Sequence, residues 1–206
     1  MFHKQLLAPI VVVISLTLSS AVAAEGVYIS GAAGHATVEN MPSADSYGYY
    51  NGDLNQTSTA FRLALGYSKD LKPALGIGGE LGYNHYGSQN YEGYTPSSYK
   101  TTLEYKYSSV DLLGKLTWHA SKCFDVYGKL GIANEMVQVS GDTDISSNSK
   151  ILPEIGAGVS YFPTEKLSID LAAYRTQGDD VEWSYNEDDN LPSIFTVVFG
   201  LSYYFS

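Results

Sequence analysis

Residues 193–205 read SIFTVVFGLSYYF and for the most part alternate between two kinds of side chain. Large apolar or aromatic residues occupy every second position, and smaller or hydroxyl-bearing residues such as Thr196, Gly200 and Ser202 stand between them. A period of two residues is the pattern of a β-strand with two different faces. The segment therefore predicts a strand that is apolar along the whole of one face.

The same alternation recurs along the rest of the chain after residue 25, and no amphipathic helical pattern of about ten residues or more interrupts it. The segments are about 9 to 14 residues long, enough for a tilted strand to cross a bilayer. The sequence thus predicts an all-β domain. Its eight predicted strands are Val27–Thr37, Ala60–Ser68, Ala74–Tyr86, Ser109–Trp118, Phe124–Val137, Pro153–Phe162, Leu167–Thr176 and Ser193–Phe205.

The connections between these strands alternate between short and long. The short ones are Lys69–Pro73, His119–Cys123 and Pro163–Lys166, and the long ones are Val38–Ser58, Gly87–Tyr107, Gln138–Ser149 and Gln177–Pro192. In an up-and-down sheet this order places all short turns at one end and all long loops at the other. An even strand number returns the last strand to the first, so we expect these two to pair and close the sheet.

The apolar face of the predicted strands carries no charge until His35, His85 and Arg175, near their long-loop ends. A Lys or Arg at the middle of a bilayer costs about 2 to 4 kcal/mol, which explains the gap. The other face is rich in Gly, Ala and Ser, which suits the narrow interior of an eight-stranded barrel better than a solvated exterior. The fold predicted is an eight-stranded antiparallel up-and-down transmembrane β-barrel.

Aromatic residues on the apolar face support this orientation. At the short-turn ends of the strands they form one predicted girdle, and Phe61, Tyr83 and Phe195 lie near the opposite rim. Two aromatic girdles around an aliphatic band match the two interfaces of a membrane. The girdle predicted at the short-turn side consists of Tyr67, Trp118, Tyr161, Tyr203 and Phe205.

The first 24 residues have the pattern of a cleaved signal peptide. Lys4 precedes an apolar stretch from Leu6 to Leu18, and small residues end in Val22-Ala23-Ala24 before Glu25. We therefore expect a barrel domain over residues 25–206. Cys123 is the only cysteine, which excludes an intramolecular disulfide. The 22 acidic against 12 basic residues give a net charge of −10, so nucleic acid is not an expected partner.

Three segments resemble the eight-stranded outer-membrane barrels of Gram-negative bacteria, the family of the outer membrane protein A transmembrane domain and its stand-alone relatives. These are GVYISGAAG at 26–34, GAGV at 156–159 and FGLSYYF at 199–205. The resemblance implies a monomer in the outer membrane, in contact with lipid and lipopolysaccharide and inserted by the barrel-assembly machinery. It also implies a role in envelope integrity or surface interaction, including adhesion to a host.

Charged residues of the polar face are predicted to form a network inside the barrel. A tight turn centred on Leu71 would set Arg62 directly opposite Glu80, which predicts an ion pair between them. The network closes the lumen in one interpretation. In the other, its excess of acids makes a small cation-preferring channel. The predicted interior charges are Arg62, Glu80, Asp111, Lys115, Lys129, Glu135, Glu154 and Asp170.

A lipid A-modifying enzyme is the third alternative, and His85-Tyr86-Gly87-Ser88 is the nearest match to a His–Ser pair. With this spacing the two side chains point to opposite faces of a regular strand, so we expect no enzyme. No cofactor or metal site is expected either, because no motif for one is present. The acidic last loop lacks the spacing of an EF-hand.

The long loops are expected to carry any binding specificity. Their Tyr, Ser, Gly and Asn content suits contacts with an extracellular protein or host ligand. The candidate surface residues are Tyr49, Tyr50, Tyr94, Asp179, Asp180, Trp183, Glu187 and Asp188.

Overall fold

The structure is a computed structural model that describes residues 25–39, 50–54, 57–94, 100–140, 145–178 and 191–205. Side-chain burial is described for 25–39, 57–88, 104–138, 147–178 and 191–205. The predicted signal peptide lies outside these ranges. None of the described residues belongs to a helix long and apolar enough to cross a membrane.

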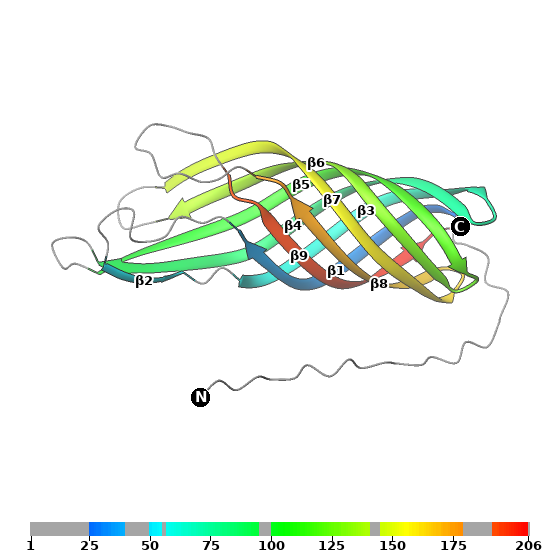
Figure 1. Cartoon of the computed structure of the whole chain (residues 1–206), viewed down its shortest axis with the longest axis horizontal. Helices are drawn as coiled ribbons and strands as arrows, with labels where there is room; N and C mark the ends of the chain where they lie inside the picture. The colour runs from blue at the N-terminus through cyan, green and yellow to red at the C-terminus, as the bar shows by residue number, and fades with distance from the viewer. Residues whose placement is uncertain are drawn as a thin grey trace, which may run out of the picture.

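The described residues form nine strands (Figure 1). They are β1 Gly26–Val38, β2 Tyr50–Leu54, β3 Thr57–Lys72, β4 Leu75–Tyr94, β5 Lys100–Ser121, β6 Phe124–Ser140, β7 Ile145–Thr164, β8 Leu167–Thr176 and β9 Ile194–Tyr204. All eight predicted strands are present, and only Ala74, Ser193 and Phe205 of their predicted bounds fall outside the observed strands. The short β2 was not predicted.

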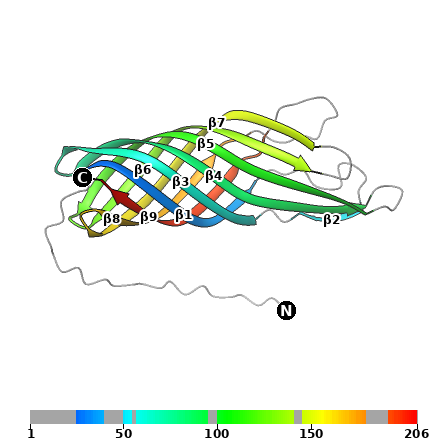
Figure 2. The ribbon, with the colours of Figure 1, turned by 180° about the vertical axis from the view of Figure 1, so that it is seen from behind.

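Eight of the strands close into an antiparallel barrel, which confirms the predicted fold (Figures 1 and 2). Their order is β4-β3-β1-β9-β8-β7-β6-β5, and a β4–β5 pairing completes the circle. The first and last strands pair as expected, with Ile29 opposite Tyr203. The remaining strand, β2, pairs with the far end of β4, where Leu54 faces Tyr91.

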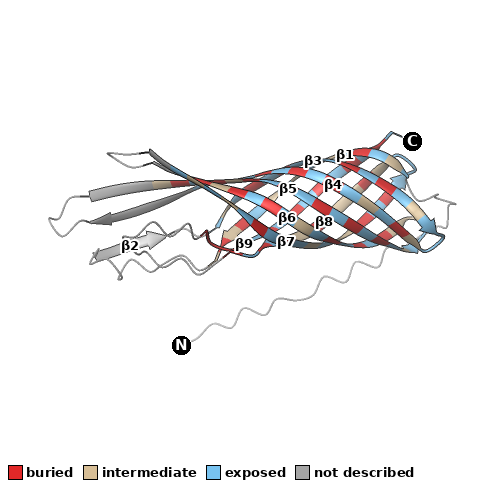
Figure 3. Cartoon of the chain, turned by 90° about the horizontal axis from the view of Figure 1, so that it is seen from above, coloured by how far each residue is buried: buried red, intermediate tan, exposed pale blue. Residues whose placement is uncertain are grey.

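Burial in the barrel is the reverse of that in a water-soluble protein. Large apolar side chains point outward, with Leu63 65% and Leu130 67% exposed, and charged side chains are buried inside. Buried and exposed positions alternate along each strand (Figure 3). Such a face is stable when lipid covers it, because the apolar surface is then removed from water. All five predicted girdle residues, Tyr67, Trp118, Tyr161, Tyr203 and Phe205, are exposed on the outer face.

The predicted long loop Gly87–Tyr107 is largely wrong, because β4 and β5 continue through most of it as a paired hairpin. The ladder runs from Ser88 opposite Lys106 to Tyr94 opposite Lys100. A register shift separates this part from the barrel, and Gly87 there has a φ of +69° that favours glycine. The predicted loop Gln138–Ser149 is likewise shortened by β6 and β7. Backbone pairing therefore continues beyond the segments whose alternation predicted a strand.

The predicted register of the first hairpin is also wrong. Lys72 pairs with Leu75, so the turn is Pro73-Ala74 and lies further along the chain than predicted. Tyr67 consequently faces Gly79, and Arg62 faces Asn84. The strands continue past the aromatic girdle into residues such as Asp70, whose polar character suggested a turn.

Candidate functional site

Apolar side chains fill both ends of the barrel interior. At the loop end, a cluster called here the loop-end plug contains Ala36, Val38, Ala60, Tyr86, Tyr105, Tyr107, Val137, Leu152, Leu191 and Ile194. At the turn end, Tyr28, Phe162 and Tyr204 pack together, with the rings of Tyr28 and Tyr204 centred 5.0 Å apart. The charged residues of the lumen lie between these two clusters.

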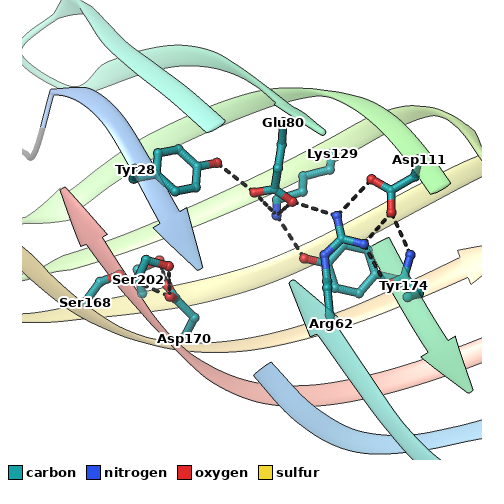
Figure 4. A network of polar contacts seen from close by, with 11 residues as sticks. Tyr28, Arg62, Glu80, Asp111, Lys129, Ser168, Asp170, Tyr174 and Ser202 are labelled. Atoms are coloured by element: carbon teal, nitrogen blue, oxygen red, sulfur yellow. Dashed lines mark hydrogen bonds and ion pairs between the residues drawn. The ribbon is translucent and has the colours of Figure 1, made fainter. Parts of the chain in front are cut away.

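Arg62 on β3 is the centre of a buried network of charges (Figure 4). Its Nη2 donates to Glu80 Oε1 at 2.7 Å and to Asp111 Oδ1 at 2.9 Å, and its Nη1 donates to Asn84 Oδ1 at 2.8 Å and to Asp111 Oδ2. The predicted ion pair with Glu80 is therefore present. It forms diagonally, since Glu80 faces Gly66 in the ladder and is not directly opposite Arg62.

Glu80 on β4 accepts hydrogen bonds from three different residues. Lys129 Nζ approaches its two oxygens at 2.7 and 2.9 Å, and the Tyr28 hydroxyl donates to Oε2 at 2.7 Å. Lys129 also donates to the Tyr174 hydroxyl at 2.8 Å, and the Arg62 guanidinium lies 4.6 Å from the centre of the Tyr174 ring. We call Arg62, Glu80, Asp111 and Lys129 the bonded region, because each of these charges has an opposite partner.

Gly82 makes room for the bonded region. A Cβ atom at this position would lie 2.5 Å from Arg62 Nη2 and 2.7 Å from Asp111 Oδ1. Only glycine lets the guanidinium pass this close to the β4 backbone. At Gly66 and Gly156 the space is taken instead by the rings of Tyr28 and Tyr174.

Asp170 and Lys115 lie nearer the turn end. The Asp170 carboxylate accepts hydrogen bonds from the hydroxyls of Ser160, Ser168 and Ser202, the last at 2.6 Å. Lys115 Nζ lies 4.5 Å from the centre of the Tyr127 ring, and its positive charge is attracted by the Asp170 carboxylate. Hydroxyls and an aromatic ring thus stabilise these two charges.

Glu135 on β6 and Glu154 on β7 differ from the other interior acids. They are 0% and 1% exposed, yet both carboxylate oxygens of Glu135 and Oε2 of Glu154 have no hydrogen-bond partner. We call them the unbonded region. The sequence placed both residues inside the barrel but contained no sign that they differ from Glu80.

At the turn end, His119 connects two neighbouring hairpins. Its Nδ1 lies 2.8 Å from Asp125 Oδ1 and its Nε2 lies 3.0 Å from Asp70 Oδ1. The three residues lie on the turn side of the predicted aromatic girdle, outside the segments expected to cross the membrane. Partial burial disfavours the charged ring, but the two carboxylates outweigh it and raise the pKa of His119. The sequence analysis missed this cluster because Asp70 is 49 residues from His119 and because Asp125, six residues from His119, was not considered as its partner.

The candidate surface residues Tyr49, Asp179, Asp180, Trp183, Glu187 and Asp188 lie outside the described residues. Tyr50 and Tyr94 belong to β2 and β4, but their side chains are outside the described part. Their role as a binding surface stays a prediction.

The geometric argument against a His85–Ser88 pair is wrong. The bulge at Gly87 shifts the register between these residues, so both are on the outer face instead of on opposite faces. A bulge cannot be recognised from the period-two pattern, although the glycine was a possible signal.

The sequence matches the family model described as the outer membrane protein beta-barrel domain over residues 8–205. The chain belongs to this family. It is accordingly an integral β-barrel protein of the Gram-negative outer membrane. No curated protein matches the chain.

Solved outer-membrane barrels share the fold. Ail, the attachment invasion locus protein of Yersinia pestis, is 21% identical, with 88% of this chain and 99% of that chain covered and a TM-score of 0.57. Neisserial surface protein A is 14% identical, with 87% and 97% covered and a TM-score of 0.54. OprG from Pseudomonas aeruginosa is 14% identical, with 88% and 98% covered and a TM-score of 0.52. At these identities the likeness establishes the fold alone.

Proposed function

We propose that this barrel has a structural and surface-interaction role, in which the lumen is closed and the extracellular hairpins contact other molecules. The observation that carries the proposal is the filling of the lumen by the loop-end plug, the bonded region and the Tyr28–Phe162–Tyr204 cluster. Eight strands leave little space beyond their own side chains. Function then belongs to the parts outside the membrane.

The β4–β5 hairpin supports this role because it continues well past the lipid-facing band as a regular ladder (Figure 1). A paired hairpin presents its side chains on a stiffer support than an irregular loop does. Outer-membrane lipid and lipopolysaccharide around a monomer, and the barrel-assembly machinery during insertion, are further partners in the proposal.

Charge favours a protein as the extracellular ligand. Ail has been crystallised with the heparin analogue sucrose octasulfate. The present chain has a net charge of −10, and its last long loop, residues 177–192, contains six acids and no Lys or Arg. Such a surface repels sulfate groups and attracts basic proteins. The ligand class we propose is therefore a host or extracellular protein with a basic surface.

A hairpin deletion tests the proposal. Gln89 and Tyr105 are paired, so residues 90–104 can be replaced by Asn-Gly while the barrel ladder and Tyr105 of the loop-end plug are kept. Bacteria that express this variant should lose adhesion to basic extracellular-matrix proteins, and the variant should still migrate differently on gels before and after boiling. Unchanged adhesion of the shortened variant would refute the role of the hairpin. The turn variant Glu165→Gln serves as the control.

A small cation-preferring channel is the first alternative, favoured by five interior acids against three interior bases. Planar-bilayer recordings separate the two functions. The closed lumen predicts no stable conductance in the wild-type barrel. A steady conductance that falls on charge reversal of Glu80 or Glu154 would establish the channel instead.

The bulge at Gly87 favours a second alternative, a lipid-modifying hydrolase with His85 and Ser88 on the outer face. Mass spectrometry of lipid A decides it. If the barrel is not an enzyme, strains with the wild-type protein and with Ser88→Ala have the same lipid A acylation. A lost acyl chain that depends on Ser88 would establish the enzyme.

A further inference from the structure

The outer face of the barrel carries an apolar groove that crosses several neighbouring strands. It runs from Leu167 on β8 and Tyr203 on β9, over β1, β3 and β4, to Val110 on β5, and its volume is about 660 Å³. Pockets of about 300 to 1,000 Å³ are typical of sites that hold a small molecule. Every residue that lines the groove is uncharged. The groove is therefore suited to an apolar ligand.

Two neighbouring rows of outward-facing residues form the walls of the groove. The row on the turn side is Ile29, Leu65 and Leu81, and the row on the loop side is Gly31, Leu63 and Tyr83. The residues between the rows point to the lumen, so the backbone forms the floor. Gly31 leaves its row open, because a Cβ atom there would have Leu63 Cδ2, at 3.7 Å, as its nearest neighbour.

The length and direction of the groove match one chain of a membrane lipid. It rises from Tyr203, at the turn end of β9, to Val110, near the middle of β5. These strands are four inter-strand spacings apart, which at about 4.8 Å each gives about 19 Å. Barrel strands tilt by about 35 to 45°, so a groove across them is inclined and descends through roughly 12 Å of the membrane. One leaflet contributes about 15 Å of hydrocarbon, and the groove covers most of it.

The lower end of the groove lies at the turn-side rim. Tyr203 belongs to the predicted turn-side girdle, and Leu167 directly follows the turn between β7 and β8. In outer-membrane barrels the short turns are periplasmic. Lys166 in this turn is exposed, and its carbonyl oxygen accepts a hydrogen bond of 2.9 Å from the Tyr204 amide. A cationic residue therefore lies beside the end of the groove, at the height of the lipid phosphates.

Packing distinguishes a lipid chain in the groove from the lipid elsewhere around the barrel. The hydrophobic effect favours neither position, because the chain leaves an equally apolar environment. A chain in the groove contacts two walls and a floor, whereas a chain on a ridge of side chains contacts protein on one side. Dispersion attraction is small for each pair of atoms but adds up along the whole chain.

We propose that the groove binds one acyl chain of a phospholipid from the periplasmic leaflet, with the phosphate near Lys166. Family membership places the outer face in the outer membrane, so lipid is what surrounds the groove at this depth. Gly31 provides the room for the chain. The site is independent of the extracellular role proposed above, because the part of β4 that lines it ends at Tyr83, before the protruding hairpin.

Native mass spectrometry of the barrel in a mild detergent tests the site. Protein refolded without lipid is titrated with palmitoyl-oleoyl phosphatidylethanolamine, and the fraction that carries one lipid is measured. The wild-type barrel should retain one lipid. Gly31→Leu places a side chain in the groove and should raise the dissociation constant about tenfold. Gly31→Ala adds a single methyl group, is the milder change for folding, and should show a smaller increase.

Gly128→Leu is the matched control. Gly128 is also exposed on the outer face, does not line the groove, and a Cβ atom there would meet nothing within 4 Å in the described part of the structure. This variant should retain lipid as the wild type does. Heat-dependent migration on gels verifies that each variant folds.

Three results would overturn the proposal. A wild-type barrel that retains no lipid would show that the groove is not a binding site. Equal retention by the Gly31 and Gly128 variants would show that the lipid contacts the outer face without a preferred position. Stronger retention of lipid A than of phosphatidylethanolamine, lost in Gly31→Leu, would assign the groove to the outer leaflet.

Discussion

The bonded and unbonded regions share one lumen and one degree of burial, but they differ in their partners. Glu80 receives hydrogen bonds from Arg62, Lys129 and Tyr28, whereas Glu135 receives none. Burial alone therefore does not decide whether an interior acid stabilises this barrel. The difference lies in whether the neighbouring strands supply a hydrogen-bond donor. Substitutions in the two regions should therefore change the free energy of unfolding in opposite directions and by different amounts.

Loss of the central base should have the largest effect. In Arg62→Gln, Asp111 loses its ion pair, and Glu80 keeps Lys129 as its only cationic partner. We expect the free energy of unfolding to fall by about 3 to 5 kcal/mol, the usual result of breaking a buried pair. Urea titration of the barrel in detergent, followed by tryptophan fluorescence, measures it. Arg175→Gln, which breaks the exposed pair with Glu39, should change it by less than about 1 kcal/mol.

Neutralising the unbonded region should have the opposite sign. Glu135→Gln should raise the free energy of unfolding by about 1 to 3 kcal/mol, because a buried carboxyl group without hydrogen-bond donors is removed. The same titration applied to Glu80→Gln should show a decrease in the free energy of unfolding. Equal signs for the two variants would remove the distinction between the regions.

A smaller effect is expected from one hydroxyl at the edge of the bonded region. Tyr174→Phe keeps the ring against which Arg62 packs but removes the acceptor for Lys129. The expected loss is about 1 kcal/mol of unfolding free energy. Tyr161→Phe changes an exposed girdle residue and provides a matched control. A loss as large as that of Arg62→Gln would show that the network depends on the hydroxyl more than on its charges.

The smallest effect should be the pH dependence at the turn end. Because the pKa of His119 is raised in the folded state, its stabilisation is complete below the ordinary pKa near 6.5 and is lost as pH rises through the raised value. The free energy of unfolding of the wild-type protein should exceed that of His119→Gln by about 0.5 kcal/mol at low pH. At high pH the two values should approach each other. Unfolding titrations between about pH 5 and 9 follow this difference. A constant difference would show that the carboxylates hold the ring without its charge.

The sequence predicted the orientation of residues better than their pairing. The period-two pattern placed Arg62, Glu80 and Glu135 inside and Leu63 outside, because a lipid-facing strand tolerates no exception near its centre. It could not give the register, since the pattern is unchanged when a strand slides by an even number of residues. The Arg62–Glu80 pair was found in spite of a wrong register because long side chains reach diagonal neighbours.

Contacts across the barrel could not be predicted from the sequence for another reason. Lys129 meets Glu80 from a strand that is not its neighbour, and this contact depends on the curvature of the closed sheet. The bulge at Gly87 and the hairpin beyond it were missed because polar residues follow no alternation there. The bonded and unbonded regions thus became distinguishable only in three dimensions.

The pairing of β1 with β9 also determines how the protein can be made. Strand β1 pairs with β3 on one side, but its other hydrogen-bonding neighbour is β9, the barrel strand that emerges last from the ribosome. Until β9 is made, that edge of β1 stays open and invites aggregation, so we expect the chain to need chaperones during export. Translation that terminates before β9 would leave a sheet that cannot close, and we expect periplasmic proteases to remove it.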